Sequence, residues 1–505
     1  MPERLEKRHR RRRAGRLGLP PSRAIDRVMS LVLACDLGST NLRVALVGSD
    51  GQVRHAVTFA AGGDADEVDP RLWRGGFIAA VDRLAAVAGA EFDAVEALAL
   101  SSLTRTQVFL GADGEPLRSA ITWRDTRAQR EVDRVRALFP TAHPEVSQLT
   151  AFHPLARLAW LAQEEPQVAR RLRAVVEPKD YLNFWLTGEC TVDPVGSARL
   201  LAARDGLEGL GYDESVIPRV AEPGTVIGRV RGELARLSGR PVVAMGNDTW
   251  ASVIGLGAMR DGYAYNLSGT TEVLGVLSNT AAAAEGLLTV DWRGGLTQLG
   301  GPSQNGADTL VWLMALLGQQ GESGAALEAV LTRPRDSQPL LFLPYLLGER
   351  TPHWDPALRG AFVGLNRRHG PADCAQAALE GVAFLNRQVL ERAETATGRQ
   401  VREIRFGGGG AANAAWCQIK ADICGRTIAV VETPEPGILG AAIVALTALG
   451  RFKSLEAGQE ALVRVRRRFD PRREAAEFYS RLYGLFREAE SALAPLSRKL
   501  VSLPR

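Results

Sequence analysis

The sequence has little cysteine and no long apolar run. Its five cysteines, at positions 35, 190, 374, 417 and 424, form no CxxC pair and have no histidine at zinc-ligand spacing. This odd, scattered set excludes a disulfide framework and favours reduced thiols in the cytoplasm. No apolar stretch approaches the roughly 20 residues that span a bilayer, so no membrane partner is expected. The longest apolar stretch, residues 437–450, predicts a buried helix instead.

The basic excess of the chain is confined to its first residues. The formal net charge is +5, but residues 1–28 alone carry +7, so the remaining 477 residues carry −2. These first residues contain no aromatic side chain and no apolar stripe, which predicts a disordered basic extension over residues 1–29. We expect translation to begin at Met29, directly before the first predicted strand. A nucleic-acid-binding arm is the alternative; no nucleic-acid partner is expected for the rest of the chain.

The length of 505 residues is too great for one hydrophobic core, so two domains are expected. Alternating strand and helix patterns predict an α/β protein. Small residues follow Leu277 (TAAAAEGL), which fits a crossover between domains. We therefore predict an N-terminal domain over residues 30–276 and a C-terminal domain over 277–455. A helical segment over 456–505 follows, with a plain surface helix at 474–493.

The stretch from Pro241 to Leu274 combines the two features that suggest phosphoryl transfer. A buried strand ends in Gly-Asn-Asp-Thr, which places Asp248 at the rim of an α/β crevice, with a helix behind it. Further on, residues 266–271 (NLSGTT) form a turn that can aim backbone N–H groups at phosphate oxygens. The alternative is that Asp248 caps the helix and that the turn is an ordinary hairpin.

A second turn of the same kind lies near the start of the chain. The strand over residues 31–35 leads into Asp36, and Gly38 lets the backbone approach an anion closely. Ser39 and Thr40 add hydroxyl donors, and the carboxylate of Asp36 suits a hydrated Mg²⁺. A simple hairpin is the alternative.

A glycine run follows the strand at residues 404–406. Residues 407–410 are four glycines, and a predicted helix over 414–424 begins just after Asn413. Such a turn presents N–H groups and a positive helix end to a nucleotide, with Asn413 fixing the helix start and contacting the nucleotide. The spacing is not GxGxxG, so a Rossmann site is not indicated.

The candidate sugar contacts lie between residues 103 and 125. Trp123 beside Asp125 suits a sugar, because C–H faces stack on indole and hydroxyls donate to carboxylates. A core tryptophan and a helix-capping aspartate are the alternative. Arg105 follows the strand predicted at residues 95–100 and can reach a ligand from that turn.

Eight blocks of the sequence stand in one order along the chain. They are DLGSTNLRVALV (36–47), GEPLRSAITWRDTR (114–127), PKDYLNFWLTGECTVD (178–193), GNDTWAS (246–252), LSGTTEVLGVL (267–277), LPYLLGERTPHWDP (343–356), RGAFVGLNRRH (359–369) and GGGGAANAAWCQIKADICGR (407–426). In these blocks the chain resembles the FGGY family of carbohydrate kinases, in particular its xylulokinase-like branch, from about Leu31 to about Phe469.

The resemblance implies the two-lobed fold of the sugar kinase, actin and heat-shock ATPase superfamily. Each lobe is then a ribonuclease H-like sheet flanked by helices, and the active site lies in the cleft between them. The N-terminal domain would be the sugar side and the C-terminal domain the nucleotide side. ATP, Mg²⁺ and a small sugar or polyol are the implied ligands, and the resemblance allows a homodimer.

The resemblance also implies roles for particular residues. Asp248 matches the catalytic base, and Asp36 matches the carboxylate that holds Mg²⁺ through water. The implied phosphate and nucleotide contacts are Gly38, Ser39, Thr40, Gly269, Thr270, Thr271, Gly306, Gly409, Gly410 and Asn413. The implied substrate contacts are Thr104, Arg105, Trp123, Asp125, Asn247 and Asp248.

One departure from the family concerns the substrate. Xylulokinases carry Gln-Met-His in the turn where this chain has Leu103-Thr104-Arg105. The guanidinium of Arg105 suits an acidic substrate, which it would bind through a bidentate contact. It also suits a four-carbon or longer polyol. The alternative is that Arg105 binds no substrate and pairs with a cleft carboxylate such as Asp125. The expected function is ATP-dependent phosphorylation of a terminal hydroxyl of a small sugar, such as a pentulose, or of a polyol. The alternatives are another sugar, a sugar acid or a tetritol as substrate, or a nucleotide-binding sugar sensor without turnover.

Overall fold

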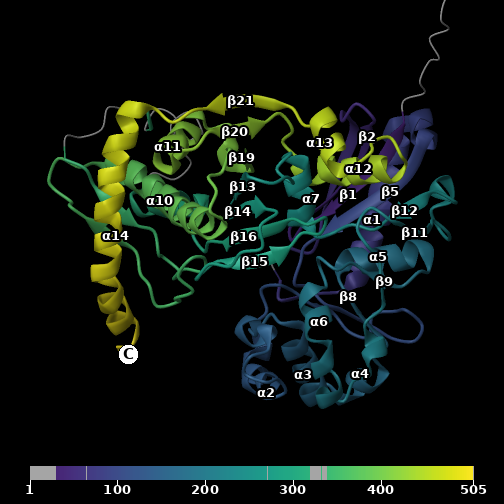
Figure 1. Ribbon diagram of the computed structural model, residues 1–505. Helices are drawn as coiled ribbons and strands as arrows, with labels where there is room; N and C mark the ends of the chain where they lie inside the picture. The colour runs from purple at the N-terminus through teal and green to yellow at the C-terminus, as the bar shows by residue number, and fades with distance from the viewer. Residues whose placement is uncertain (1–29, 64, 270, 319–330, 333–337, 504–505) are drawn as a thin grey trace, which may run out of the picture.

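Two mixed β-sheets form two lobes (Figure 1). The computed structural model describes residues 30–63, 65–269, 271–318, 331–332 and 338–503. The prediction of a two-lobed α/β protein is confirmed. The expectations for residues 1–29 and for Thr270 lie outside the described residues.

The first sheet has the strand order β11-β12-β5-β1-β2-β3. Strands β1, β2 and β3 form an antiparallel meander, and β5 and β12 follow parallel to β1. Because β1 is covered on both faces, its sequence is a continuous apolar run. The bounds are β1 Leu31–Leu37, β2 Asn41–Gly48, β3 Val53–Ala60, β5 Val95–Ser102, β11 Val226–Arg229 and β12 Pro241–Val243.

The second sheet has the strand order β15-β16-β14-β13-β19-β20-β21. It repeats the first pattern, since β13, β14 and β16 form the antiparallel meander and β19 and β20 are the parallel strands. The β1–β2 turn and the β13–β14 turn therefore occupy equivalent places in the two lobes. The bounds are β13 Tyr263–Ser268, β14 Glu272–Ser278, β15 Leu288–Asp291, β16 Thr297–Pro302, β19 Glu403–Gly407, β20 Ile428–Val431 and β21 Val465–Phe469.

Helices cover both faces of the first sheet. Helices α1 (Pro70–Ala88) and α5 (Pro178–Thr187) pack on one face, whereas α7 (Asp248–Gly255) and α12 (Pro436–Ala448) pack on the other. A helical subdomain projects from this lobe (Figure 1). It contains α2 Val132–Arg136, α3 Pro154–Glu164, α4 Pro166–Arg171 and α6 Ala198–Ala202. No helix in the described part of the chain is both long enough and apolar enough to cross a bilayer.

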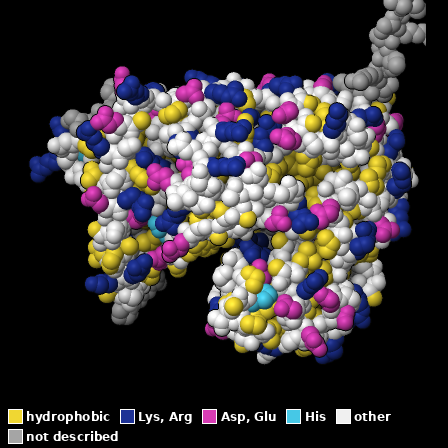
Figure 2. Space-filling view, in the orientation of Figure 1, with side chains coloured by type: hydrophobic (Ala, Val, Ile, Leu, Met, Phe, Trp, Pro, Cys, Tyr) yellow, Lys and Arg dark blue, Asp and Glu magenta, His cyan; other side chains and the backbone are white. Residues whose placement is uncertain are grey.

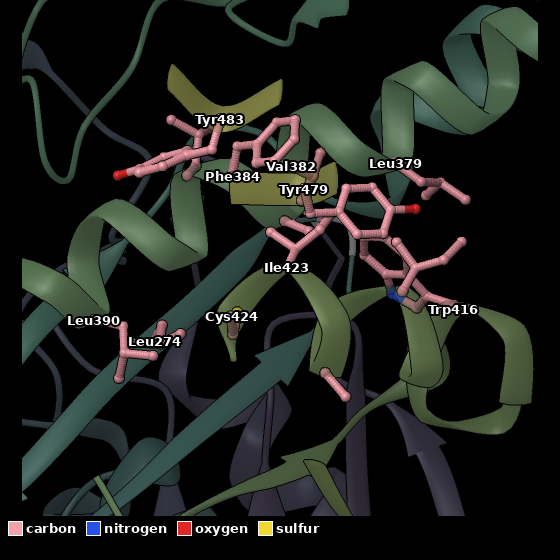
Figure 3. Packing of buried hydrophobic residues seen from close by; sticks show 14 of the residues in the cluster. Leu274, Leu379, Val382, Phe384, Leu390, Trp416, Ile423, Cys424, Tyr479 and Tyr483 are labelled. Carbon is pink, nitrogen blue, oxygen red and sulfur yellow. The ribbon is translucent and has the colours of Figure 1, made fainter. Parts of the chain in front are cut away.

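The last helix of the chain, α14 (Arg473–Val501), belongs to the core of the second lobe. It was predicted as a plain surface helix, which is wrong. Tyr479, Leu482, Tyr483 and Phe486 form a buried stripe at helical spacing. The stripe packs on Phe384 of α10 (Pro371–Thr397), whose ring lies beside Tyr479 and Tyr483 in Figure 3. The rings of Phe384 and Phe486 are 5.1 Å apart. The segment 456–505 also contributes a strand, β21, in addition to its helices α13 (Leu455–Leu462) and α14.

Helices α7 and α12 approach each other backbone to backbone. A Cβ atom added at Gly440 of α12 would lie 1.8 Å from the carbonyl oxygen of Ala251, and one added at Gly255 of α7 would lie 1.8 Å from that of Pro436. Only glycine fits at such a distance. Helix α12 follows β20 of the second lobe in the chain, yet it packs on β1 and β5 of the first. This helix pair therefore links the two lobes.

The close approach predicts a stability effect for Gly440→Ala. The added methyl group collides with a backbone oxygen that cannot move without separating α7 from α12, so we expect the free energy of unfolding to fall by about 1–3 kcal/mol. The matched control is Gly484→Ala in α14, where nothing lies within 4 Å of the added Cβ. There, alanine should stabilise by roughly 0.5–1 kcal/mol. Equal melting temperatures for the two variants would contradict the close packing.

Candidate active site

Asp248 is the first residue of α7, and residues 244–247 connect it to the carboxyl end of β12. The helix is capped by its neighbour, because the Trp250 N–H donates to Asn247 Oδ1 at 2.9 Å. The alternative that Asp248 is the cap is therefore wrong. The Thr249 N–H donates to Asp248 Oδ1 at 2.6 Å, and no hydrogen bond to Asp248 Oδ2 occurs among the described residues. One carboxylate oxygen thus remains available to a ligand.

Asp36 lies at the same edge of the sheet, near the end of β1. Its Oδ1 accepts a hydrogen bond from Ser101 Oγ at 2.9 Å, and a Cβ added at Gly437 of α12 would lie 2.9 Å from its Oδ2. Desolvation by the surrounding protein raises the pKa of Asp36 to about 6. Desolvation, followed by the negative charge of Asp36, raises the pKa of Asp248 to about 7. Two carboxylates so placed resist simultaneous ionisation, and a divalent cation would relieve that repulsion. This set of oxygen donors fits Mg²⁺.

The β1–β2 turn lies beside the predicted aromatic contact. Trp123 Nε1 donates to Ser39 Oγ at 2.9 Å, and the Gly38 N–H donates to the Asn41 carbonyl at 2.9 Å. Gly38, Ser39, Leu103 and Trp123 line one small recess. Trp123 is partly buried and packs against the edge of the first lobe's hydrophobic core. The structure brings the β1–β2 turn and Trp123 together.

The predicted nucleotide-binding segments converge in the second lobe. The Ala307 N–H, next to Gly306 at the start of α8 (Ala307–Leu316), donates to the Gly269 carbonyl at 3.0 Å. A Cβ added at Gly408 would lie 2.3 Å from the Ser268 carbonyl oxygen, and one added at Gly410 would lie 2.5 Å from Ser268 Oγ. Three segments that are far apart in the sequence therefore meet at the β13–β14 turn.

Asn413 caps α11 (Ala414–Cys424), since the Trp416 N–H donates to its Oδ1 at 2.7 Å. This confirms that Asn413 fixes the helix start. The N–H groups of the first turn of α11 point back toward the glycine run, which is the geometry that favours an anion.

Thr104 and Arg105 are held by a glutamate that the sequence analysis did not identify. Thr104 Oγ1 and the Arg105 N–H donate to Glu177 Oε1 at 3.2 and 3.3 Å. Desolvation raises the pKa of Glu177 to about 7, and the charges of Asp193 and Asp248 add to the rise. The partners Asp180 and Asp193 complete a carboxylate cluster of the kind that can hold a metal.

The cluster around Glu177 is balanced by a buried lysine. Lys179 Nζ lies 3.3 Å from Glu177 Oε2, 3.0 Å from Asp180 Oδ2 and 2.6 Å from Asp193 Oδ2. The ammonium therefore occupies the position between the three carboxylates. A Cβ added at Gly196 would lie 2.1 Å from Glu177 Oε2, so this glycine makes room for the carboxylate.

Asp125 differs from its expected role as a substrate contact. Its carboxylate accepts hydrogen bonds from the Arg127 N–H and Nε, both at 2.7 Å, and only 4% of its side chain is exposed. It therefore pairs with Arg127, the first residue of the short helix at residues 127–131, whose N-cap is Thr126. The alternative that Asp125 pairs with Arg105 is wrong.

Comparison with known proteins identifies the family. Residues 31–255 match the N-terminal domain of the FGGY family of carbohydrate kinases, and residues 264–449 match its C-terminal domain. The chain belongs to the FGGY family of carbohydrate kinases. It is 30% identical to a xylulose kinase of Escherichia coli, over 84% of this chain and 91% of that protein. It is 26% identical to a xylulose kinase of Staphylococcus epidermidis, over 94% of this chain and 99% of that protein. A solved xylulose kinase structure from Rhodospirillum rubrum superposes with a TM-score of 0.82 at 26% identity. The match covers 92% of this chain and 99% of that one.

A buried ion pair lies beneath the β13–β14 turn of this FGGY kinase. Lys420 Nζ donates to Glu272 Oε2 at 2.9 Å, to Asn266 Oδ1 at 2.7 Å and to Asn386 Oδ1. Glu272 Oε1 in turn accepts from Ser268 Oγ at 2.5 Å. The sequence analysis missed this network, because Lys420 stands beside the polar Gln418 and Asp422 in the helix over 414–424 and no short pattern sets it apart.

A second missed carboxylate orders the approach to Gly306. Glu349 accepts hydrogen bonds from the Gln304 N–H at 2.7 Å, Asn305 Nδ2 at 2.9 Å and Ser303 Oγ at 2.9 Å. These bonds tie the loop after β17 (Leu341–Leu343) to the segment that leads into α8. The sequence signal that could have pointed to Glu349 is the polar stretch GERTPHWD, which follows an apolar strand.

The Lys420 network predicts a stability effect. Lys420→Met leaves the Glu272 carboxylate buried without its cation, so we expect the free energy of unfolding to fall by about 3–5 kcal/mol. The exposed Lys453→Met is the control and should change it by less than about 0.5 kcal/mol. Chemical denaturation of both variants measures the difference. A Lys420→Met protein as stable as the control would contradict the network.

Proposed function

We propose that this FGGY kinase transfers the γ-phosphoryl group of ATP to a terminal hydroxyl of a small sugar or polyol, with Asp248 as the general base. The observation that carries the proposal is the position of Asp248, at the edge of the first sheet beside Asp36. The relatives named as xylulose kinases support a sugar acceptor. A nucleotide-binding sensor without turnover is not favoured, because the candidate base is present. The five cysteines are free thiols, which supports a reducing compartment such as the cytoplasm.

The free oxygen of Asp248 determines how the proton moves. As the sugar oxygen forms its bond to the γ-phosphorus, the hydroxyl proton passes to Asp248 Oδ2, and the bond from that phosphorus to the β–γ bridging oxygen breaks to leave ADP. Asp248 then releases the proton to water as the product departs. The enzyme mainly aligns the groups and stabilises charge, since phosphoryl transfer needs little covalent help.

The glycine turns stabilise the transferring group in this proposal. The turns at residues 38–40 and 269–271 direct N–H and hydroxyl donors at phosphate oxygens, while the segment 409–413 binds the rest of the nucleotide. Asp36 would hold Mg²⁺ through water, and the cation supplies positive charge for the β- and γ-phosphates when bound. The first lobe thus binds the sugar and the second lobe the nucleotide.

Asp248→Asn tests the assignment of the base. The amide cannot accept the proton, so we expect kcat to fall by about 10²–10⁴ while ADP binding is kept. A coupled ADP-release assay and calorimetry measure the two quantities. The exposed Asp82→Asn in α1 is the matched control and should keep full activity. Near-full activity in Asp248→Asn would remove this residue from the role.

The raised pKa of Asp248 predicts a pH dependence. A general base must be deprotonated to accept a proton, and the pKa of Asp248 is raised to about 7. We therefore expect kcat/KM for the sugar to fall about tenfold per pH unit below pH 7 and to level off above it. Initial rates from pH 5 to 9 measure the profile. A flat profile down to pH 5 would contradict the shift.

A further inference from the structure

A single buried arginine joins the two loops that carry the predicted sugar contacts Thr104 and Trp123. Arg157 lies on α3 and is fully buried. Its guanidinium donates to five oxygen atoms of residues 104–107 and 121–125, namely the carbonyls of Arg105, Ile121, Thr122 and Asp125 and Oε1 of Gln107. One side chain therefore holds both loops.

Helix α3 reaches these loops from the helical subdomain, which projects from the first lobe (Figure 1). Figure 2 shows a hollow between this subdomain and the second lobe. Because the subdomain projects in this way, its contacts with the first lobe decide how it is held. The hydrogen bonds of Arg157 are such contacts, and they end on the two loops.

The planar shape of the guanidinium sets the spacing of the two loops. Its Nη1 atom bonds both of them, with 2.6 Å to the Arg105 carbonyl and 3.1 Å to the Ile121 carbonyl. Its Nη2 atom donates to the carbonyls of Thr122 and Asp125, the latter at 3.5 Å. An ammonium group has three donors on one atom and cannot span such a set, whereas the rigid fork of arginine can.

The charge of Arg157 is not balanced by a carboxylate. In the part of the chain that the structure describes, no carboxylate lies within ion-pair distance of its guanidinium, and its buried Nε has no hydrogen-bond partner. The Asp125 carboxylate pairs with Arg127 instead, at 2.6 Å. A buried charge is costly, and an apolar side chain would fill the same space at a lower cost. The hydrogen bonds to the loops are thus what an arginine adds at this position.

The first loop contains a strained residue that depends on this support. The φ of Arg105 is +55°, in the left-handed region. Its carbonyl accepts from Arg157, while its N–H donates to Glu177 Oε1 at 3.3 Å. Thr104 Oγ1 donates to the same Glu177 oxygen at 3.2 Å. Such strain persists only where the surrounding structure holds it, so Glu177 and Arg157 together fix the direction of Thr104.

The second loop forms a wall beside the β1–β2 turn. Trp123 lies between the carbonyls that Arg157 binds, and its Nε1 donates to Ser39 Oγ at 2.9 Å. Leu103, directly before the first loop, lines the same recess with Gly38, Ser39 and Trp123. Both loops therefore border the recess at the turn that faces phosphate in the proposed function.

We infer that Arg157 is a positioning residue for the sugar acceptor, because it fixes the spacing between Thr104 and Trp123 without contacting the sugar. This inference rests on the proposed function. Hydrogen bonds and ring stacking to a polyhydroxy compound weaken steeply when their geometry is lost. The nucleotide contacts lie in the other lobe, so the loss of Arg157 should weaken the binding of the acceptor and not that of ATP.

A panel of acceptors comes first in the test. ADP release by the wild-type enzyme is measured with D-xylulose, D-ribulose, xylitol, erythritol and D-gluconate, and the compound with the highest kcat/KM is used afterwards. Release that depends on none of them would contradict the proposed function, and the inference with it. Release that depends on any of them makes the variants below a test of the inference alone.

Arg157→Met removes the hydrogen bonds to both loops. We expect KM for the acceptor to rise at least about tenfold, with a smaller change in kcat and a change of less than about twofold in KM for ATP. Arg157→Lys keeps the charge and bonds part of the set, so its KM for the acceptor should lie between those of the wild type and Arg157→Met. Circular dichroism checks that each variant is folded.

Tyr212→Phe is the matched control, because the Tyr212 hydroxyl donates to the Leu158 carbonyl of the same helix at 3.0 Å. It loses a buried hydrogen bond, so its melting temperature should fall while both KM values stay at the wild-type level. An acceptor KM that is unchanged in folded Arg157→Met, or a KM for ATP that rises equally, would overturn the inference. If Arg157→Met does not fold, the same two outcomes in Arg157→Lys decide.

Discussion

The repulsion between Asp36 and Asp248 is the constraint around which the site is built. Strands β1 and β12 both flank β5, so their carboxyl ends bring the two carboxylates to one edge of the sheet. The backbone contact between α7 and α12 then holds them there, because α7 begins at Asp248 and the start of α12 lies against Asp36. Burial at this edge raises both pKa values, and the charge of Asp36 adds to the rise at Asp248. It provides a base that is strong enough to accept a proton near neutral pH and an arrangement that favours a cation.

Three buried charged groups are balanced by partners of opposite sign. Carboxylates lie within hydrogen-bond distance of the buried Lys179 and of the buried Lys420, and the buried Asp125 pairs with Arg127. The fold thus neutralises its charges where they serve the structure.

Local patterns predicted those parts of the site that depend on local geometry. The glycine turns, the cap at Asn413 and the helix at residues 414–424 follow from short sequence signals, and the structure places them as expected. Long-range partners could not be predicted in this way. Lys420 and Glu272 are 148 residues apart, and no sequence pattern indicates that their side chains meet in the fold. Asp125 was assigned to the sugar because Arg127, two residues on, was not recognised as its partner. The helix α14 was predicted to lie on the surface, because the sequence does not indicate that its aromatic stripe packs against α10.

The direct interaction of the two carboxylates is open to one decisive measurement. The carboxylate absorption of Asp248 can be titrated by isotope-edited infrared difference spectroscopy, with Asp248→Asn as the reference. The account predicts a pKa near 7 in the otherwise unmodified protein and a lower value in an Asp36→Asn background, because one negative charge has been removed. An Asp248 pKa that is the same in both backgrounds would show that the carboxylates do not interact, and would contradict the account.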